Sequence, residues 1–143
     1  MAGKVVGVDS SELMIEIAAR CNRPLIDTGC AELVLAAVES LPFPDHSFDK
    51  ALCVHVLYFW RDLDAALGEI ARVLKPGGQL ALLFRTRADR AAVASFPPEI
   101  YSFPPLADVT AALERAGMRI PPGSNCGSEP ALLLAEKRPG WKR

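Results

Sequence analysis

Residues 51–84, ALCVHVLYFWRDLDAALGEIARVLKPGGQLALLF, contain the alternation that decides the fold of this chain. Ala51 to Leu57 is an uninterrupted apolar run, which is typical of a buried β-strand. Asp62 or Asp64 can cap a helix that follows. The apolar face of that helix consists of Leu67, Ile70, Ala71 and Leu74. The K-P-G-G sequence after it ends the helix, since proline cannot continue it and glycine accepts a positive φ. Leu80 to Phe84 is the next apolar run, so the stretch predicts strand, helix, strand.

The same alternation precedes this stretch. Lys4 to Asp9 (KVVGVD) is valine-rich and ends at an acidic residue, which predicts a buried strand. Residues 10–21 (SSELMIEIAARC) have helical apolar spacing, residues 22–29 have the composition of a loop, and Leu33 to Val38 is a second apolar run. Strands with continuous hydrophobicity that alternate with helices indicate a parallel sheet covered on both faces.

The last third of the chain is richer in proline and is predicted to be less regular. Four prolines between residues 97 and 105 predict an irregular, lid-like segment after Arg85, with a short helix near residues 88–94. The stripe from Leu106 to Ala116 predicts a helix closed by Gly117, and Ala131 to Glu136 predicts a final strand. No linker divides the chain, so we expect a single domain over residues 1–143.

Composition excludes several classes of protein. The 143 residues carry a formal net charge of −1, so no broad positive field is available for nucleic acid or an anionic membrane. Half of the residues are hydrophobic and 23% are charged, which favours a folded core over disorder. No apolar run approaches the roughly 20 residues of a membrane span, and the N-terminus does not have the pattern of a signal peptide. We therefore expect no nucleic-acid partner and no membrane partner.

The four cysteines, at positions 21, 30, 53 and 126, form no C-x-x-C pair and have no metal-ligand spacing. Three of them lie in or beside apolar segments, which indicates reduced thiols that pack in the interior. Reduced thiols of this kind predict a cytoplasmic protein.

In open parallel sheets, ligands bind at the carboxyl ends of the strands. Asp9 follows the first predicted strand, and a carboxylate there can accept both hydroxyls of a ribose. The alternative is that Asp9 caps the next helix, with Glu12 as its capping partner. The pattern alone leaves these two interpretations evenly balanced.

Other polar residues near strand ends have mostly structural explanations. His55 can serve as an acid, a base or a donor to a ligand, although a satisfied, partly buried histidine is the commoner case. Tyr58, Phe59 and Trp60 can line a pocket or belong to the core. Asp45, His46 and Asp49 are typical of a surface turn rather than of a metal site. We therefore predict no metal.

A nucleoside-binding fold of this type usually carries a glycine-rich loop after its first strand, with an acidic residue about 20 positions later. Counted back from Asp9, that loop falls before Met1. The 143 residues contain no G-x-G.

Three motifs in sequence order resemble those of class I S-adenosylmethionine-dependent methyltransferases of the small-molecule, type 11 kind. They are the G-V-D-x-S-x-x-M pattern at 7–14, the L-P-F-x-D-x-S-F-D pattern at 41–49 and L-K-P-G-G at 74–78. The resemblance is firm over about residues 3 to 85. It implies an α/β, Rossmann-like, mostly parallel sheet with helices on both faces, truncated at the N-terminus, with an antiparallel last strand.

The same resemblance implies a function. The chain would bind S-adenosylmethionine as cofactor and transfer its methyl group to a small-molecule acceptor. The residues implied for the cofactor are Asp9, Ser10, Met14, Val38, Glu39, Cys53 and Val54. Those implied for the methyl acceptor are His55, Tyr58 and Arg85. No catalytic residue follows from the resemblance, and Ala37 stands where relatives often carry an aspartate that binds adenine.

Compared with the family, the first strand, the glycine-rich loop and the first helix are absent, so cofactor binding by this chain is expected to be impaired. The absent strand is central in the family. Two apolar strand edges would then be open, so KVVGVD either pairs with the 51–57 strand or takes a neighbour from another chain. We thus expect a homo-oligomer or a complementing chain. The alternative function is that of a non-catalytic fragment that acts through a partner subunit or self-association. A nicotinamide-dependent oxidoreductase has less support.

Overall fold

The computed structural model describes residues 3–126 and 129–141. The chain divides into two compact units, Met1–Pro42 and Phe43–Arg143. The prediction of a single domain therefore stays a prediction.

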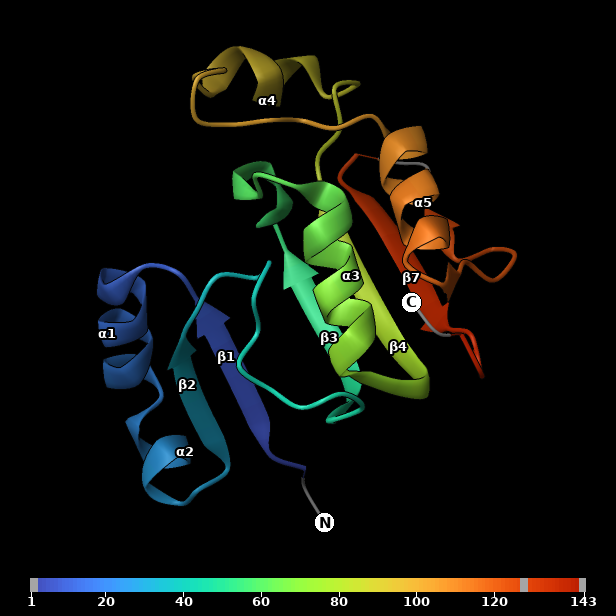
Figure 1. Cartoon of the computed structure of the whole chain (residues 1–143). Helices are drawn as coiled ribbons and strands as arrows, with labels where there is room; N and C mark the ends of the chain where they lie inside the picture. The colour runs from blue at the N-terminus through green and yellow to red at the C-terminus, as the bar shows by residue number, and fades with distance from the viewer. Residues whose placement is uncertain (1–2, 127–128, 142–143) are drawn as a thin grey trace. The chain divides into compact units, whose positions relative to one another are not determined.

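The first unit is a small α/β layer (Figure 1). Its elements are β1 (Val5–Asp9), α1 (Glu12–Cys21), α2 (Arg23–Asp27) and β2 (Ala31–Leu35). The two strands pair in parallel, with Val5 opposite Ala31 and Asp9 opposite Leu35. Helix α1 begins after Ser11, whose side chain accepts a hydrogen bond from the Met14 N–H. No residue described in this unit is fully buried, so its apolar side chains contribute little to a core of their own.

The second unit is larger and contains a five-stranded sheet. Its elements are β3 (Phe48–Val54), the 3-10 helix η1 (Leu57–Phe59), α3 (Leu63–Val73), β4 (Leu74–Phe84), α4 (Arg90–Ser95), α5 (Leu106–Arg115), β5 (Met118–Arg119), β6 (Asn125–Cys126) and β7 (Ala131–Lys137). The strand order is β3-β4-β7-β5, and β6 pairs with β7. Strands β3 and β4 are parallel, whereas β7 runs antiparallel to β4. The antiparallel last strand is thereby confirmed.

The core of the second unit lies on one face of this sheet, where Figure 1 shows α3 and α5. Its fully buried large side chains come from both helices and from β4, β5 and β7: Leu67, Leu74, Leu80, Leu82, Phe84, Val109, Leu113, Met118 and Leu133. Because neighbouring side chains of a strand point to opposite faces, the residues between these positions point away from the helices.

The opposite face of the sheet is apolar and exposed. Leu52, Ala81 and Leu134 are register partners on three adjacent strands, so their side chains share this face. Leu52 is 71% exposed and Leu134 is 45% exposed.

Most predicted elements are confirmed, including the helix capped by Asp62, whose carboxylate accepts the Ala65 N–H at 2.9 Å. Two strands are shifted by two or three residues, since β2 begins at Ala31 and β3 at Phe48. The loop predicted at residues 22–29 contains α2, because Pro24 fits the first turn of a helix. The Thr28 hydroxyl donates to the Pro24 carbonyl at 3.0 Å and closes that turn.

Direct pairing of KVVGVD with the 51–57 strand stays a prediction, because β1 belongs to the first unit and β3 to the second. Within its own unit, β1 pairs with β2, and β3 pairs with β4. The prediction of packing thiols is wrong for two cysteines: Cys21 and Cys30 are exposed, and Cys53 is half-buried.

Candidate functional site

Asp9 ends β1 and lies opposite the last residue of β2. One of its carboxylate oxygens accepts the Ser11 N–H at 2.8 Å. Ser11, not Asp9, is the residue that caps α1, so the capping interpretation of Asp9 is wrong. Its second carboxylate oxygen has no hydrogen-bond partner within the ranges 3–126 and 129–141. The half-buried Asp9 carboxylate can therefore accept a further hydrogen bond at the carboxyl end of β1.

The other candidates of the first unit lie near the same edge. Because β1 and β2 are parallel, their carboxyl ends meet, and the chain continues from them into Ser10 and into the turn at Val38 and Glu39. Ser10 is exposed, Met14 in the first turn of α1 is exposed, and Val38 and Glu39 are half-buried. The topology thus brings this unit's five candidates to one edge of a two-stranded sheet.

The candidates of the second unit follow β3 and β4. Val54 is the register partner of Leu83, so the carboxyl ends of these parallel strands also meet at one edge. Cys53 shares the covered face with Leu82, and burial raises the pKa of its thiol to about 11. It is therefore a neutral thiol near pH 7 and a poor nucleophile. Val54 points to the exposed face and is 43% exposed.

His55 ends β3 because its backbone adopts a left-handed conformation, with φ at +53°. Its N–H donates to the Leu83 carbonyl at 2.8 Å, and the chain then turns into η1. The Nδ1 atom of His55 lies 2.9 Å from the Tyr58 hydroxyl. That hydroxyl also accepts the Arg85 N–H at 2.6 Å. Three residues implied for the methyl acceptor are therefore joined by two hydrogen bonds.

Tyr58 is the buried centre of this group and is 6% exposed. Desolvation raises the pKa of its hydroxyl, and the Arg85 backbone N–H opposes this effect. The hydroxyl is accordingly protonated near neutral pH.

The Arg85 side chain has a structural partner. Its guanidinium pairs with the Asp89 carboxylate, which caps α4 by accepting the Ala92 N–H at 2.9 Å. The Ala92 N–H and then Arg85 lower the pKa of Asp89. Arg85 therefore ties the end of β4 to the start of α4.

Aromatic rings of the 96–103 segment pack against η1. The ring centroids of Tyr58 and Phe103 are 5.0 Å apart, as are those of Phe59 and Tyr101. Phe96 lies 4.7 Å from Tyr101. Tyr58 is thus core, whereas Phe59 is 54% exposed and belongs to the rim of this cluster. The aromatic residues within the proline-rich segment are the feature of the sequence that could have indicated this cluster.

An open pocket of about 320 Å³ lies beside the carboxyl end of β4, and the sequence analysis did not predict it. Thr86, Arg87, Ala88, Pro105, Leu106, Glu129 and Ala131 line it. The Glu129 carboxylate accepts the Thr86 N–H at 3.0 Å and also the Thr86 hydroxyl. These two residues are far apart in sequence, so no local pattern could reveal the pair.

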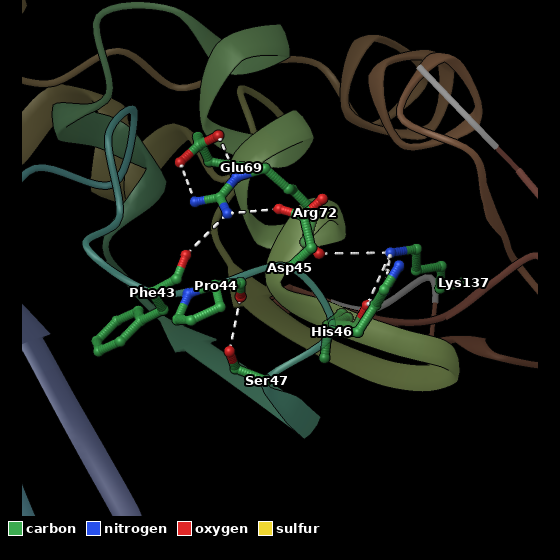
Figure 2. A network of polar contacts seen from close by, with 9 residues as sticks. Phe43, Pro44, Asp45, His46, Ser47, Glu69, Arg72 and Lys137 are labelled. Atoms are coloured by element: carbon green, nitrogen blue, oxygen red, sulfur yellow. Dashed lines mark hydrogen bonds and ion pairs between the residues drawn. The ribbon is translucent and has the colours of Figure 1, made fainter.

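Figure 2 shows that the turn around Asp45 is held to the end of α3 by Arg72. The Arg72 guanidinium donates to Asp45 and to the Phe43 carbonyl, each at 2.8 Å, and pairs with Glu69. Asp45 and His46 are therefore parts of a structural turn, and within the described residues no group of three potential ligands gathers for a metal. No helix in the same described ranges is long and apolar enough to cross a membrane.

Comparisons with known proteins add family information to this geometry. The family described as Methyltransferase domain matches residues 1–82. The ubiquinone/menaquinone biosynthesis C-methyltransferase of Hahella chejuensis is 38% identical over 108 residues, which are 71% of this chain and 41% of that protein. The enzyme of the same name from Escherichia coli O1:K1 is 42% identical over 84 residues, 57% of this chain and 32% of that protein. The match thus spans less than half of each relative.

Solved structures share the fold at lower identity. The PH0226 protein from Pyrococcus horikoshii has a TM-score of 0.79 at 19% identity, covering 94% of this chain and 72% of that one. A SAM-dependent methyltransferase from Methanosarcina mazei has a TM-score of 0.75 at 21% identity, covering 96% and 83%. The [4+2]-cyclase SpnF reaches 0.77 at 21% identity, covering 96% and 68%. These likenesses establish a Rossmann-like α/β fold, and the cyclase illustrates that the fold does not fix the reaction.

Since the family match covers more than half of the 143 residues and the motifs, fold and relatives agree with it, the chain belongs to the class I S-adenosylmethionine-dependent methyltransferase family.

Proposed function

We propose that this chain binds S-adenosylmethionine and supports methyl transfer to a small-molecule acceptor. The observation that carries the proposal is Asp9, a half-buried carboxylate at the carboxyl end of β1 that keeps an oxygen without a partner among the described residues. A carboxylate in this position suits the two hydroxyls of a ribose, because it accepts two hydrogen bonds in a fixed geometry.

The candidate residues of each unit suit a different part of the cofactor. We assign the nucleoside to Asp9 together with Ser10, Met14, Val38 and Glu39, which share one sheet edge. We assign the methionine part to Cys53 and Val54 at the end of β3. Cys53 supports this role as a neutral, weakly reactive neighbour, because burial raises its pKa to about 11.

The cofactor supplies an activated methyl group on a sulfonium centre. The residues of this chain then have to hold the acceptor in line and exclude water. We propose that His55, Tyr58 and Arg85 face the acceptor. The Tyr58 hydroxyl connects these residues, because it is hydrogen-bonded both to the Arg85 backbone N–H and to His55. The curated relatives are C-methyltransferases of ubiquinone and menaquinone biosynthesis by name, which supports a small organic acceptor.

Calorimetric titration of the chain with S-adenosylmethionine tests the proposal. We expect measurable but weak binding, because the 143 residues contain no G-x-G to supply backbone donors. Asp9→Ala should weaken binding about tenfold or more, as expected for the loss of a charge-assisted hydrogen bond.

The matched control is Asp27→Ala. Asp27 is an exposed carboxylate of the same unit and pairs with Arg23 at 3.9 Å. This variant should bind the cofactor like the original chain. The proposal fails if the original chain shows no binding at millimolar cofactor, or if Asp9→Ala and Asp27→Ala bind equally well.

A second candidate function is supported by the exposed face of the second sheet. Leu52 and Leu134 are exposed on one apolar face of the sheet in the second unit, and within the described strands of that unit β3 pairs only with β4. A non-catalytic fragment would use this surface and edge to bind a second copy or a complementing chain. Size-exclusion chromatography with light scattering separates the two functions. A monomer that binds the cofactor supports the first, and a stable oligomer that does not bind it supports the second.

We also propose a cytoplasmic location, which the free, exposed thiols of Cys21 and Cys30 support.

A further inference from the structure

The tautomer of His55 follows from the hydrogen bonds of its neighbour. A backbone N–H can only donate, so the Arg85 N–H occupies the Tyr58 hydroxyl oxygen as an acceptor. The hydroxyl hydrogen then needs an acceptor of its own. Among the described residues, the only one within hydrogen-bond distance is Nδ1 of His55, at 2.9 Å.

An imidazole nitrogen that accepts a hydrogen bond carries no hydrogen. Nδ1 of His55 is therefore the unprotonated nitrogen of the neutral ring, and the single ring hydrogen is on Nε2. The opposite tautomer would place two donors on the Tyr58 oxygen and leave its buried hydrogen without an acceptor, which is costly.

The surroundings hold this ring in place. The Tyr58 ring is fixed by the aromatic cluster, with Phe103 at 5.0 Å, and the His55 backbone is fixed by its bond to Leu83. The left-handed turn at His55 ends β3, so the ring stands at the carboxyl end of the strand and is half-buried. Ligands of such sheets bind at that end.

We propose that His55 offers its Nε2–H as a hydrogen-bond donor to the methyl acceptor, and that Tyr58 is the positioning residue that fixes this tautomer. For the atom that receives this hydrogen bond we propose an oxygen of the acceptor molecule, such as a carbonyl or hydroxyl oxygen. The oxygen requirement rests on the proposed function, whereas the tautomer does not.

The tautomer is tested by two-bond ¹H–¹⁵N NMR on the ¹⁵N-labelled chain near pH 8, where an ordinary imidazole is neutral. The chain has two histidines, so the spectrum of His55→Gln assigns the signals. We expect Nδ1 of His55 to be unprotonated and Nε2 protonated. Tyr58→Phe should abolish this preference, because it removes the hydroxyl and keeps the ring. Tyr101→Phe is the matched control from the same cluster and should leave the tautomer unchanged. A hydrogen on Nδ1, or no effect of Tyr58→Phe, overturns the proposal.

The oxygen requirement is tested with 1-tetralone and tetralin, which share a ring system and differ by a carbonyl. Millimolar 1-tetralone should shift the Nε2–H signal of His55, and tetralin should not. Equal shifts with both probes, or none with 1-tetralone, overturn the oxygen requirement. Both experiments are done without cofactor. Failure of cofactor binding with the expected NMR result would therefore reject only the proposed function, and the reverse combination would reject only this inference.

Discussion

The ammonium group of Lys137 lies 2.7 Å from the carbonyl oxygen of Leu74, the residue that closes α3. It also lies 3.5 Å from the Arg72 carbonyl. Lys137 is the last residue of β7 and is 3% exposed. A cation at a helix C-terminus donates hydrogen bonds to carbonyls that have no partner within the helix. It also interacts favourably with the negative end of the helix dipole. Lys137 thus fastens the last strand to the end of α3.

Replacing Lys137 should destabilise the second unit. Lys137→Met keeps much of the side-chain volume but leaves the Leu74 carbonyl buried without this donor. We expect a loss of about 1–3 kcal/mol in the free energy of unfolding, measured with urea. Lys75→Met is the control, since the exposed Lys75 to Asp49 ion pair should contribute less than about 1 kcal/mol. Equal losses for both variants would contradict the capping role.

The pH dependence of the Lys137 contribution has a definite sign. Burial lowers the pKa of Lys137 below its usual value of 10.5. Between the lowered pKa and 10.5, the unfolded chain binds more protons than the folded chain, so stability rises with pH in that window. The stability difference between the original chain and Lys137→Met should therefore be larger near pH 10.5 than near pH 8. A difference that shrinks with rising pH would contradict this assignment.

The three described free cysteines should differ in reactivity. Cys21 and Cys30 are exposed, whereas Cys53 is half-buried and burial raises its pKa to about 11. Because only the thiolate reacts, iodoacetamide near pH 8 should label Cys21 and Cys30 first and leave Cys53 largely unmodified until the chain unfolds. Peptide mass spectrometry over time measures each site. Labelling of Cys53 as fast as Cys30 would show that its thiol is not shielded.

The sequence predicted the elements whose signals are local. Asp62 as a helix cap and Gly117 as a helix end are recognised from residue types at fixed offsets, and both are present in the structure. The strand at residues 51–57 was placed too late, because hydrophobicity continues through Leu57 while the backbone turns at His55. The pattern of hydrophobic residues does not reveal that a histidine adopts the left-handed conformation.

The parts of the candidate site that depend on distant residues could not be predicted. The bond between Tyr58 and the Arg85 N–H spans 27 positions, and the pair of Thr86 and Glu129 spans 43. Each depends on which strand ends the fold brings together. The position of Asp9 at the end of a strand could be predicted from a local pattern, whereas its bond to the Ser11 N–H depends on backbone geometry.

The two glycines of the L-K-P-G-G motif should differ in their tolerance of a side chain, although they are adjacent. Gly77 has φ at +76° and open space around it, so Gly77→Ala should cost only the left-handed strain of about 1–2 kcal/mol. A Cβ on Gly78 would lie 2.8 Å from the Lys75 carbonyl oxygen and 3.2 Å from that of Asp49. Both oxygens belong to the backbone at the junction of α3, β3 and β4. The clash with an added Cβ can therefore be removed only by a shift of the backbone. Gly78→Ala should therefore destabilise the chain more than Gly77→Ala, in the range of about 2–4 kcal/mol by urea unfolding. If Gly77→Ala proves the more damaging change, the motif would act through its turn conformation rather than through the close approach of β3 to the start of β4.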